Sequence, residues 1–134
     1  MLSILNMKLN TIQTEEAILI HKAEPSNEEM CISLSRKFEK SETDTNAYTG
    51  KCVAELRFAS EEDLELLNCS FVVRVSMTGH FSCTSSPDER TSDKLNESIL
   101  FHLLPHVRAC MASLMSSAGV SPYLIPSSII PELS

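Results

Sequence analysis

The chain contains 134 residues, 43% of them hydrophobic, and carries a formal net charge of -7 at pH 7. The hydrophobic content excludes a disordered chain, and the length predicts one domain, residues 1–134, with a core that needs no disulfide or metal staples. The acidic balance argues against binding to nucleic acid or to an anionic membrane surface, because both attract basic proteins.

The N-terminal segment, MLSILNMKLN, lacks the basic region and the small-residue cleavage site of a signal peptide. No stretch approaches the roughly 20 apolar residues that a membrane-spanning helix needs, so no membrane insertion is expected. The five cysteines are an odd number without a C-x-x-C pair, which favours free thiols over a disulfide framework or a zinc site. We therefore expect a cytoplasmic protein.

The first strand-like segment, residues 4–22, alternates irregularly between apolar and polar side chains. A change of phase near Thr11–Glu16 predicts a β-bulge or a bend. After it, the alternation restarts and places Ile18 and Ile20 on one face.

Three later segments alternate regularly, as half-buried strands do. They are residues 30–40, 51–59 and 69–83, with connections expected at 41–50, 60–68 and 84–93. The connection 60–68 is acidic, and we expect a turn there with a helical tendency.

From about Asn96 the apolar residues recur every three or four positions, which predicts a helix of about 22 residues. Its apolar face consists of Leu95, Ile99, Leu103, Val107, Met111 and Leu114. Pro105 is expected to kink or start this helix, and Gly119 to stop it. Three prolines in PYLIPSSIIPELS then predict an extended strap.

The predicted fold is α+β: a four-stranded antiparallel sheet followed by one long helix and a Pro-rich C-terminal strap. One helix buries only part of one face of a sheet of four long strands. We therefore expect subunits to associate and complete the burial.

His102 and His106 are spaced i, i+4, which lets two imidazoles meet one metal. No third ligand follows in the sequence, and Pro105 interrupts the turn between them. Cys110 lies on or beside the apolar stripe, where a buried thiol is expected. We predict no metal, no cofactor and no catalysis; the alternative is a thiol- or metal-dependent hydrolase that uses His102, His106 and Cys110.

The segment FHLLPHVRACMASLMSSAGVSPYLIP, residues 101–126, resembles the long-helix region of SecB, the bacterial protein-export chaperone family. The matching residues are Leu104, Pro105, His106, Arg108, Ser113, Gly119, Pro122, Leu124 and Pro126. The segments SFVVRVSMTGHFSC and LNTIQTEEAILI resemble the family's fourth and first strands. The resemblance covers most of the chain.

This resemblance implies a homotetramer, built as a dimer of dimers with the helices toward its centre. It also implies ATP-independent holding of unfolded or partly folded polypeptides, the clients of the chaperone, in protein export. The expected subunit interface consists of Leu103, Val107, Arg108, Met111 and Leu114.

The sequence departs from the family in two ways. The family usually continues past the strap into a second helix and an acidic tail, most of which this short variant lacks. The family also docks the export motor ATPase on an acidic sheet face, where Glu16 matches an acid but Ile20 and Arg74 replace acids. Docking to that ATPase is therefore doubtful.

A holding chaperone needs exposed apolar surface that accepts many sequences, and extended clients can also add to a sheet edge. We expect that surface between the first strand, the loop after it and the strap. The client-binding candidates are Ile18, Ile20, Phe38, Phe58, Tyr123, Leu124, Ile125, Ile129 and Ile130. The alternative is a specialised chaperone or adaptor for one partner such as an antitoxin, which some family members serve.

Overall fold

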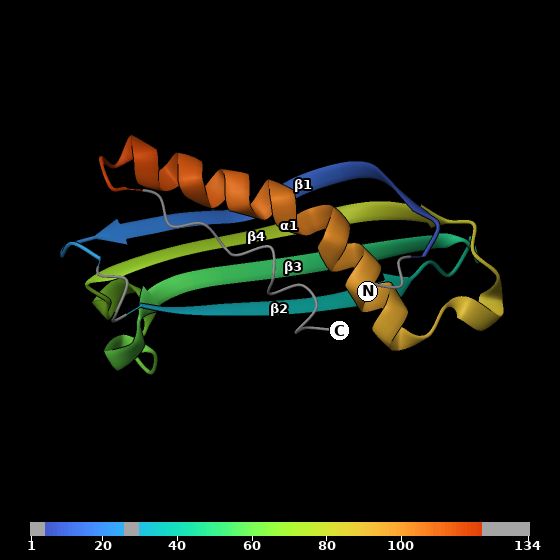
Figure 1. Cartoon of the computed structure of the whole chain (residues 1–134), viewed down its shortest axis with the longest axis horizontal. Helices are drawn as coiled ribbons and strands as arrows, with labels where there is room; N and C mark the ends of the chain where they lie inside the picture. The colour runs from blue at the N-terminus through green and yellow to red at the C-terminus, as the bar shows by residue number, and fades with distance from the viewer. Residues whose placement is uncertain (1–4, 26–29, 122–134) are drawn as a thin grey trace.

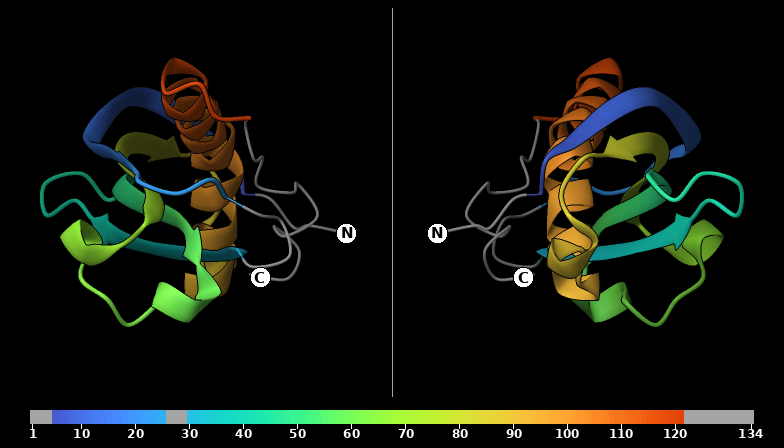
Figure 2. Two further views of the ribbon diagram at one scale, coloured as in Figure 1. Left: turned by 90° about the vertical axis from the view of Figure 1, so that its left-hand side faces the viewer. Right: turned by 90° about the vertical axis from the view of Figure 1, so that its right-hand side faces the viewer.

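A computed structural model describes residues 5–25 and 30–121, which form an antiparallel sheet with one helix packed on one face (Figures 1 and 2). The main elements are β1 (Met7–His21), β2 (Met30–Lys40), β3 (Ala47–Phe58), β4 (Phe71–Cys83) and α1 (Ser92–Ser117). The strand order is β1-β4-β3-β2, so β1 and β2 form the edges. The predicted α+β layout is confirmed, and the predicted strap lies outside the described residues.

The core lies between α1 and the face of the sheet that α1 covers, here called the inner face; the opposite face is the outer face (Figure 2). On β4 the buried inner side chains are Phe71, Val73, Val75, Met77, Phe81 and Cys83. On α1 they are Leu95, Ile99, Leu100, Leu103, Leu104, Val107, Met111 and Met115. The predicted alternation of β4 and the apolar face of the helix are confirmed, except that Leu114 is only half-buried.

β1 contains two β-bulges, at Asn10 and Glu15, where its pairing with β4 shifts by one residue. The second lies inside Thr11–Glu16, as the change of phase in the sequence predicts. Each bulge changes which alternate side chains face the core. As a result, Ile18 and Ile20 point to the outer face of the sheet.

β3 begins at Ala47, so the prediction that residues 41–50 form a loop is wrong for 47–50. Gly50 is a strand residue, and it permits close packing of the helix. A Cβ atom on Gly50 would lie 2.5 Å from Cγ2 of Ile99. Gly50 therefore allows α1 to pack closely on the sheet, and it does not form a turn.

α1 begins at Ser92, earlier than the predicted start near Asn96. Thr91 caps the helix, because its side-chain oxygen accepts a hydrogen bond from the Lys94 N–H at 3.3 Å. The first turn is polar, so the apolar periodicity that begins at Leu95 does not reveal it.

The end of α1 is a Schellman motif. The Val120 N–H donates to the Met115 carbonyl at 2.8 Å, and the Gly119 N–H donates to the Ser116 carbonyl at 3.1 Å. Gly119 adopts a φ of 75°, a conformation that favours glycine. The predicted stop at Gly119 is confirmed.

Pro105 lies inside α1, and the helix bends near its middle (Figure 1). Proline has no N–H to donate to the carbonyl four residues earlier, which explains a kink there. By length and composition α1 could also cross a membrane. Its apolar face packs on the sheet, which accounts for this composition; the absence of membrane insertion stays a prediction.

Candidate functional site

An incompletely covered row of apolar side chains follows β2 on the inner face. We call it the β2 row, and it consists of Met30, Ile32, Leu34 and Phe38. Arg36, which pairs with the buried Cys52 of β3, lies on the same face between Leu34 and Phe38 and interrupts the row. All four apolar side chains are half-buried against the core, whereas their inner-face neighbours on β3 are buried. The β2 row therefore offers apolar surface that the described residues do not fully cover.

The path of α1 explains this incomplete cover. The helix crosses the sheet diagonally, from the β2–β3 turn toward β1, so β2 diverges from it along most of its length (Figure 1). β2 is also an edge strand, which pairs with β3 alone within the described part of the chain. No described residue pairs with the main-chain N–H and C=O groups on the side of β2 that faces away from β3, so these groups could pair with an added strand.

The structure separates the predicted client-binding residues. Phe38 belongs to the β2 row, where its ring meets that of Tyr48 edge-on at a centroid distance of 6.2 Å. Ile18 and Ile20 are half-buried on the opposite, outer face. The candidates Tyr123, Leu124, Ile125, Ile129 and Ile130 lie outside the described residues.

Phe58 requires a correction. It is 9% exposed and belongs to the core of the chain, so it has little surface to offer a client. Its alternating position in β3 predicted an apolar face, but alternation alone does not separate a covered central strand from an open edge.

Sequence reasoning missed Met30, Ile32 and Leu34 as site residues. The signal was present, because these side chains alternate with Ser33 and Ser35 along β2. What the sequence lacked was the position of β2 at the sheet edge, away from the helix.

The predicted subunit interface also requires a correction. Leu103, Val107 and Met111 are 0–1% exposed, because they fill the core between α1 and the sheet of their own chain. They are therefore not available to a second subunit. Arg108 and Leu114 are half-buried and retain some surface, so their role at an interface stays a prediction.

The two histidines of α1 differ in their surroundings. His102 is half-buried, its Nδ1 lies 2.7 Å from the Ser98 carbonyl oxygen, and its ring meets Phe81 edge-on. His106 is exposed. Within residues 5–25 and 30–121, no group of three His, Cys, Asp or Glu side chains could hold a metal ion.

Cys110 is half-buried, and burial raises the pKa of its thiol. A nucleophilic cysteine needs the opposite shift, because the thiolate is the reactive form. This observation counts against the alternative of a thiol hydrolase.

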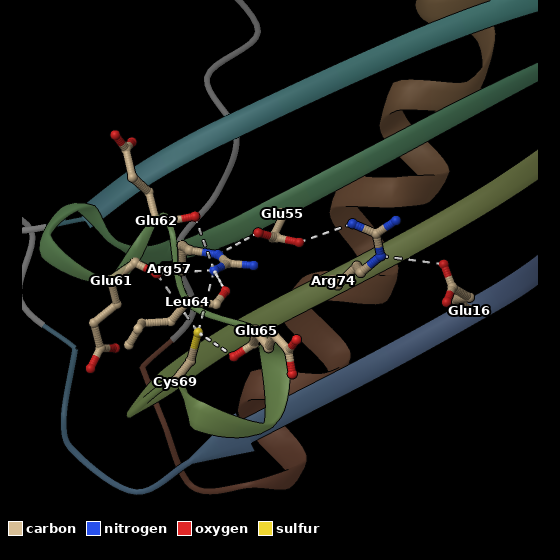
Figure 3. Close-up of polar contacts among 9 residues, drawn as sticks. All are labelled: Glu16, Glu55, Arg57, Glu61, Glu62, Leu64, Glu65, Cys69 and Arg74. Carbon is tan, nitrogen blue, oxygen red and sulfur yellow. Dashed lines mark hydrogen bonds and ion pairs between the residues drawn. The ribbon is translucent and has the colours of Figure 1, made fainter.

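A chain of ion pairs crosses the outer face from β1 to β3 (Figure 3). Arg74 of β4 donates to Glu16 at 3.3 Å and to Glu55 at 2.9 Å, and Glu55 also pairs with Arg57. Burial opposes ionisation of Glu55, but the hydrogen bonds from Arg57 and Arg74 outweigh it and lower the pKa of its carboxyl. Glu16, the predicted docking residue, is thus exposed but neutralised by Arg74.

Arg57 also organises the acidic connection between β3 and β4 (Figure 3). Its guanidinium donates to the carbonyls of Glu61 at 3.0 Å and Leu64 at 2.7 Å. Two short 3-10 turns, Ala59–Glu61 and Leu66–Asn68, form there, which confirms the predicted helical tendency. This part of the outer face is therefore a polar, internally paired surface, unlike the β2 row.

Comparison with solved structures identifies the fold. The chain matches the SecB-like chaperone Rv1957 of Mycobacterium tuberculosis, solved with a ChAD peptide from the HigA1 antitoxin, at a TM-score of 0.61 and 12% identity over 90% of each chain. This chain has a SecB-like fold. The SecB-like fold confirms the resemblance seen in the helix and strand segments.

A second similar structure is a protein of unknown function from Streptococcus agalactiae, with a TM-score of 0.50 and 9% identity. The match covers 92% of this chain and 99% of that chain. No family model matches the sequence, and no curated relative does. A fold hosts many functions, so the activity has to be argued from the surface itself.

Proposed function

We propose that this protein is a chaperone that holds unfolded or partly folded polypeptides without using ATP. The observation that carries the proposal is the β2 row on an open edge strand. Main-chain hydrogen bonds to the edge of β2 would hold an extended client of almost any sequence. The β2 row would take alternate apolar side chains of that client, without a pocket that selects one of them.

The similar SecB-like chaperone supports this proposal, because it was solved with a bound peptide. That peptide comes from an antitoxin, which favours a second candidate: a chaperone or adaptor dedicated to one such partner. Affinity capture from a cell extract separates the two. One dominant partner favours the dedicated chaperone, and a broad set of unfolded proteins favours general holding.

We also propose that the protein works in the cytoplasm as a homotetramer, a dimer of dimers. Its five cysteines, all within the described residues, are free thiols, which suits a reducing compartment. Docking to the export motor ATPase is not part of the proposal. The ion pair between Arg74 and Glu16 and the apolar Ile20 leave little negative charge on this part of the outer face.

The test compares two matched substitutions on opposite faces of the sheet, Leu34→Ser in the β2 row and Ile18→Ser on the outer face. Both side chains are half-buried aliphatics on edge strands. The readout is light scattering by a chemically denatured client after dilution, with chaperone at equal molar concentration. We expect the unaltered protein to suppress aggregation, Leu34→Ser to lose at least half of this protection, and Ile18→Ser to retain it.

Thermal unfolding of both variants checks that they remain folded. No protection by the unaltered protein, even in excess, would refute the holding activity. Loss of protection in Ile18→Ser alone would instead place the client on the outer face and refute the role of the β2 row.

A further inference from the structure

A cavity of about 560 Å³ opens at the end of the β2 row, where the β2–β3 turn meets the start of α1. Phe38, Tyr48 and Leu95 supply its apolar wall, and Tyr48 and Leu95 are themselves buried in the core. Lys40 and Arg90 supply its charged side chains. The cavity thus combines an apolar wall with two positive charges.

Arg90 is held rigidly, and its charge is not neutralised. Its guanidinium donates to the carbonyls of Thr45 at 2.9 Å and Ser85 at 2.7 Å, and to the side-chain oxygen of Asn46 at 2.9 Å. These acceptors are all neutral. Within the described residues, neither Arg90 nor Lys40 forms an ion pair.

Two of the nearby carboxylates have other partners. Asp44 accepts a hydrogen bond from the Asn46 N–H at 2.9 Å, and Glu89 accepts one from the Ser86 hydroxyl at 3.0 Å. Neither carboxylate lines the cavity. Ser92, the first residue of α1, does line it, so the positive end of a 26-residue helix adds to the charge of the two cations.

We propose that this cavity binds the C-terminal residue of a client polypeptide, with the carboxylate on Lys40 and Arg90 and an apolar last side chain on Phe38 and Tyr48. The proposal rests on the proposed holding function. A C-terminal residue carries a carboxylate and an apolar side chain on one Cα atom, as the arrangement of the cavity requires. A client strand that runs parallel to β2 along its open edge would end at Lys40, beside the cavity.

The test uses fluorescence anisotropy with three labelled peptides of equal length. One ends in leucine with a free carboxylate, one has the same end as an amide, and one has the amide end with an internal Asp-Leu pair. Charge-assisted hydrogen bonds to two cations are expected to make the free-acid peptide bind about fivefold to tenfold more tightly than the amide. This preference should weaken as the salt concentration rises.

Two variants locate the effect. Lys40→Gln should reduce the preference for the free acid, whereas Lys37→Gln, on the same strand but the opposite face, should leave it unchanged. Both lysines are exposed, so neither change should affect folding. Thr45→Trp, which fills the cavity while keeping the main-chain carbonyl that binds Arg90, should abolish the preference.

Equal affinity for the free-acid and amide peptides would overturn the inference and leave the holding function intact. Equal affinity for the internal Asp-Leu peptide and the free-acid peptide would overturn it as well. The cavity would then bind acidic side chains and not specifically a C-terminal carboxylate. Failure of the unaltered protein to suppress client aggregation is a separate result, and it would refute the holding function itself.

Discussion

Glu55 joins two arginines on the outer face and is the most connected carboxylate of the ion-pair chain. Glu55→Gln removes the charge while keeping the shape, and we expect it to lower the free energy of unfolding by about 1.5–3 kcal/mol at pH 7, the range for hydrogen bonds to charged groups. Urea unfolding measures this change. Glu39→Gln, a matched change at an exposed position of β2 that forms no ion pair with another described residue, should alter stability by less than about 0.5 kcal/mol.

The effect of Glu55→Gln should depend on pH. The folded-state pKa of Glu55 lies below its unfolded value, so its stabilising contribution is present above the unfolded pKa of about 4.3 and is lost as the pH falls through the folded pKa. The stability difference between the two proteins should therefore shrink in acid. A difference that stays constant from pH 7 to pH 3 would show that the charge of Glu55 is not what stabilises the fold.

Cys52 is expected to be the thiol most resistant to alkylation. Burial raises its pKa to about 11, although the neighbouring Arg36 opposes the shift. At pH 8 we expect no modification of Cys52 in the folded protein, while the half-buried Cys31 reacts. Mass spectrometry after iodoacetamide treatment measures this, and unfolded protein, in which every cysteine should react, is the control. Rapid modification of Cys52 in the folded chain would contradict its placement in the core.

The contact between β3 and α1 depends on a glycine. Gly50→Ala places a Cβ atom too close to Ile99, and we expect a loss of about 1–3 kcal/mol in the free energy of unfolding from overpacking. In an Ile99→Ala background the same change should cost much less, because the conflicting side chain is gone. This double-mutant cycle is measured by urea unfolding. Equal costs in the two backgrounds would mean that α1 does not pack on Gly50.

The open edge strand links the fold to the proposed activity at the level of elements. β2 would be a hazard for aggregation if its edge were flat and apolar on both faces. Its outer-face positions are instead polar, with Ser33, Ser35, Lys37 and Glu39 opposite the β2 row. A mainly apolar face, interrupted by Arg36, and one open edge are what the proposed binding of an extended client requires.

For the whole molecule, three of the predicted interface residues, Leu103, Val107 and Met111, lie in the core, so the proposed assembly has to use other surface. The exposed apolar side chains with large surface include Phe101 of α1, 45% exposed, and Ile12 of β1, 38% exposed. If assembly places the helices at its centre, as the resemblance implies, Phe101→Ser should lower the mass in solution and Ile12→Ser should not. Light scattering measures that mass against the subunit mass of 14.9 kDa. The opposite pattern would place the interface on β1, and a monomeric unaltered protein would refute the assembly.

The sequence by itself determined the elements of this fold. Strand alternation in β2, β3 and β4, the helical period after Leu95 and the stop at Gly119 are local signals, and local geometry follows from them. The bulge in β1 was also readable, because an inserted residue shifts the phase of the alternation. Two predicted boundaries were wrong: the start of α1 at Ser92, because the helix begins with polar, exposed residues, and the start of β3 before Gly50, because that glycine serves tertiary packing.

Only the tertiary structure decided which apolar residues remain open. Phe38 and Phe58 alternate alike in sequence, yet one lies on the sheet edge and the other in the core. Ile18 is equally apolar but lies on the other face. Strand order and the diagonal path of α1 set the difference between Phe38 and Phe58, whereas the bulges of β1 set the face of Ile18. Strand order and the path of α1 depend on contacts between residues far apart in the chain, which a local pattern does not encode.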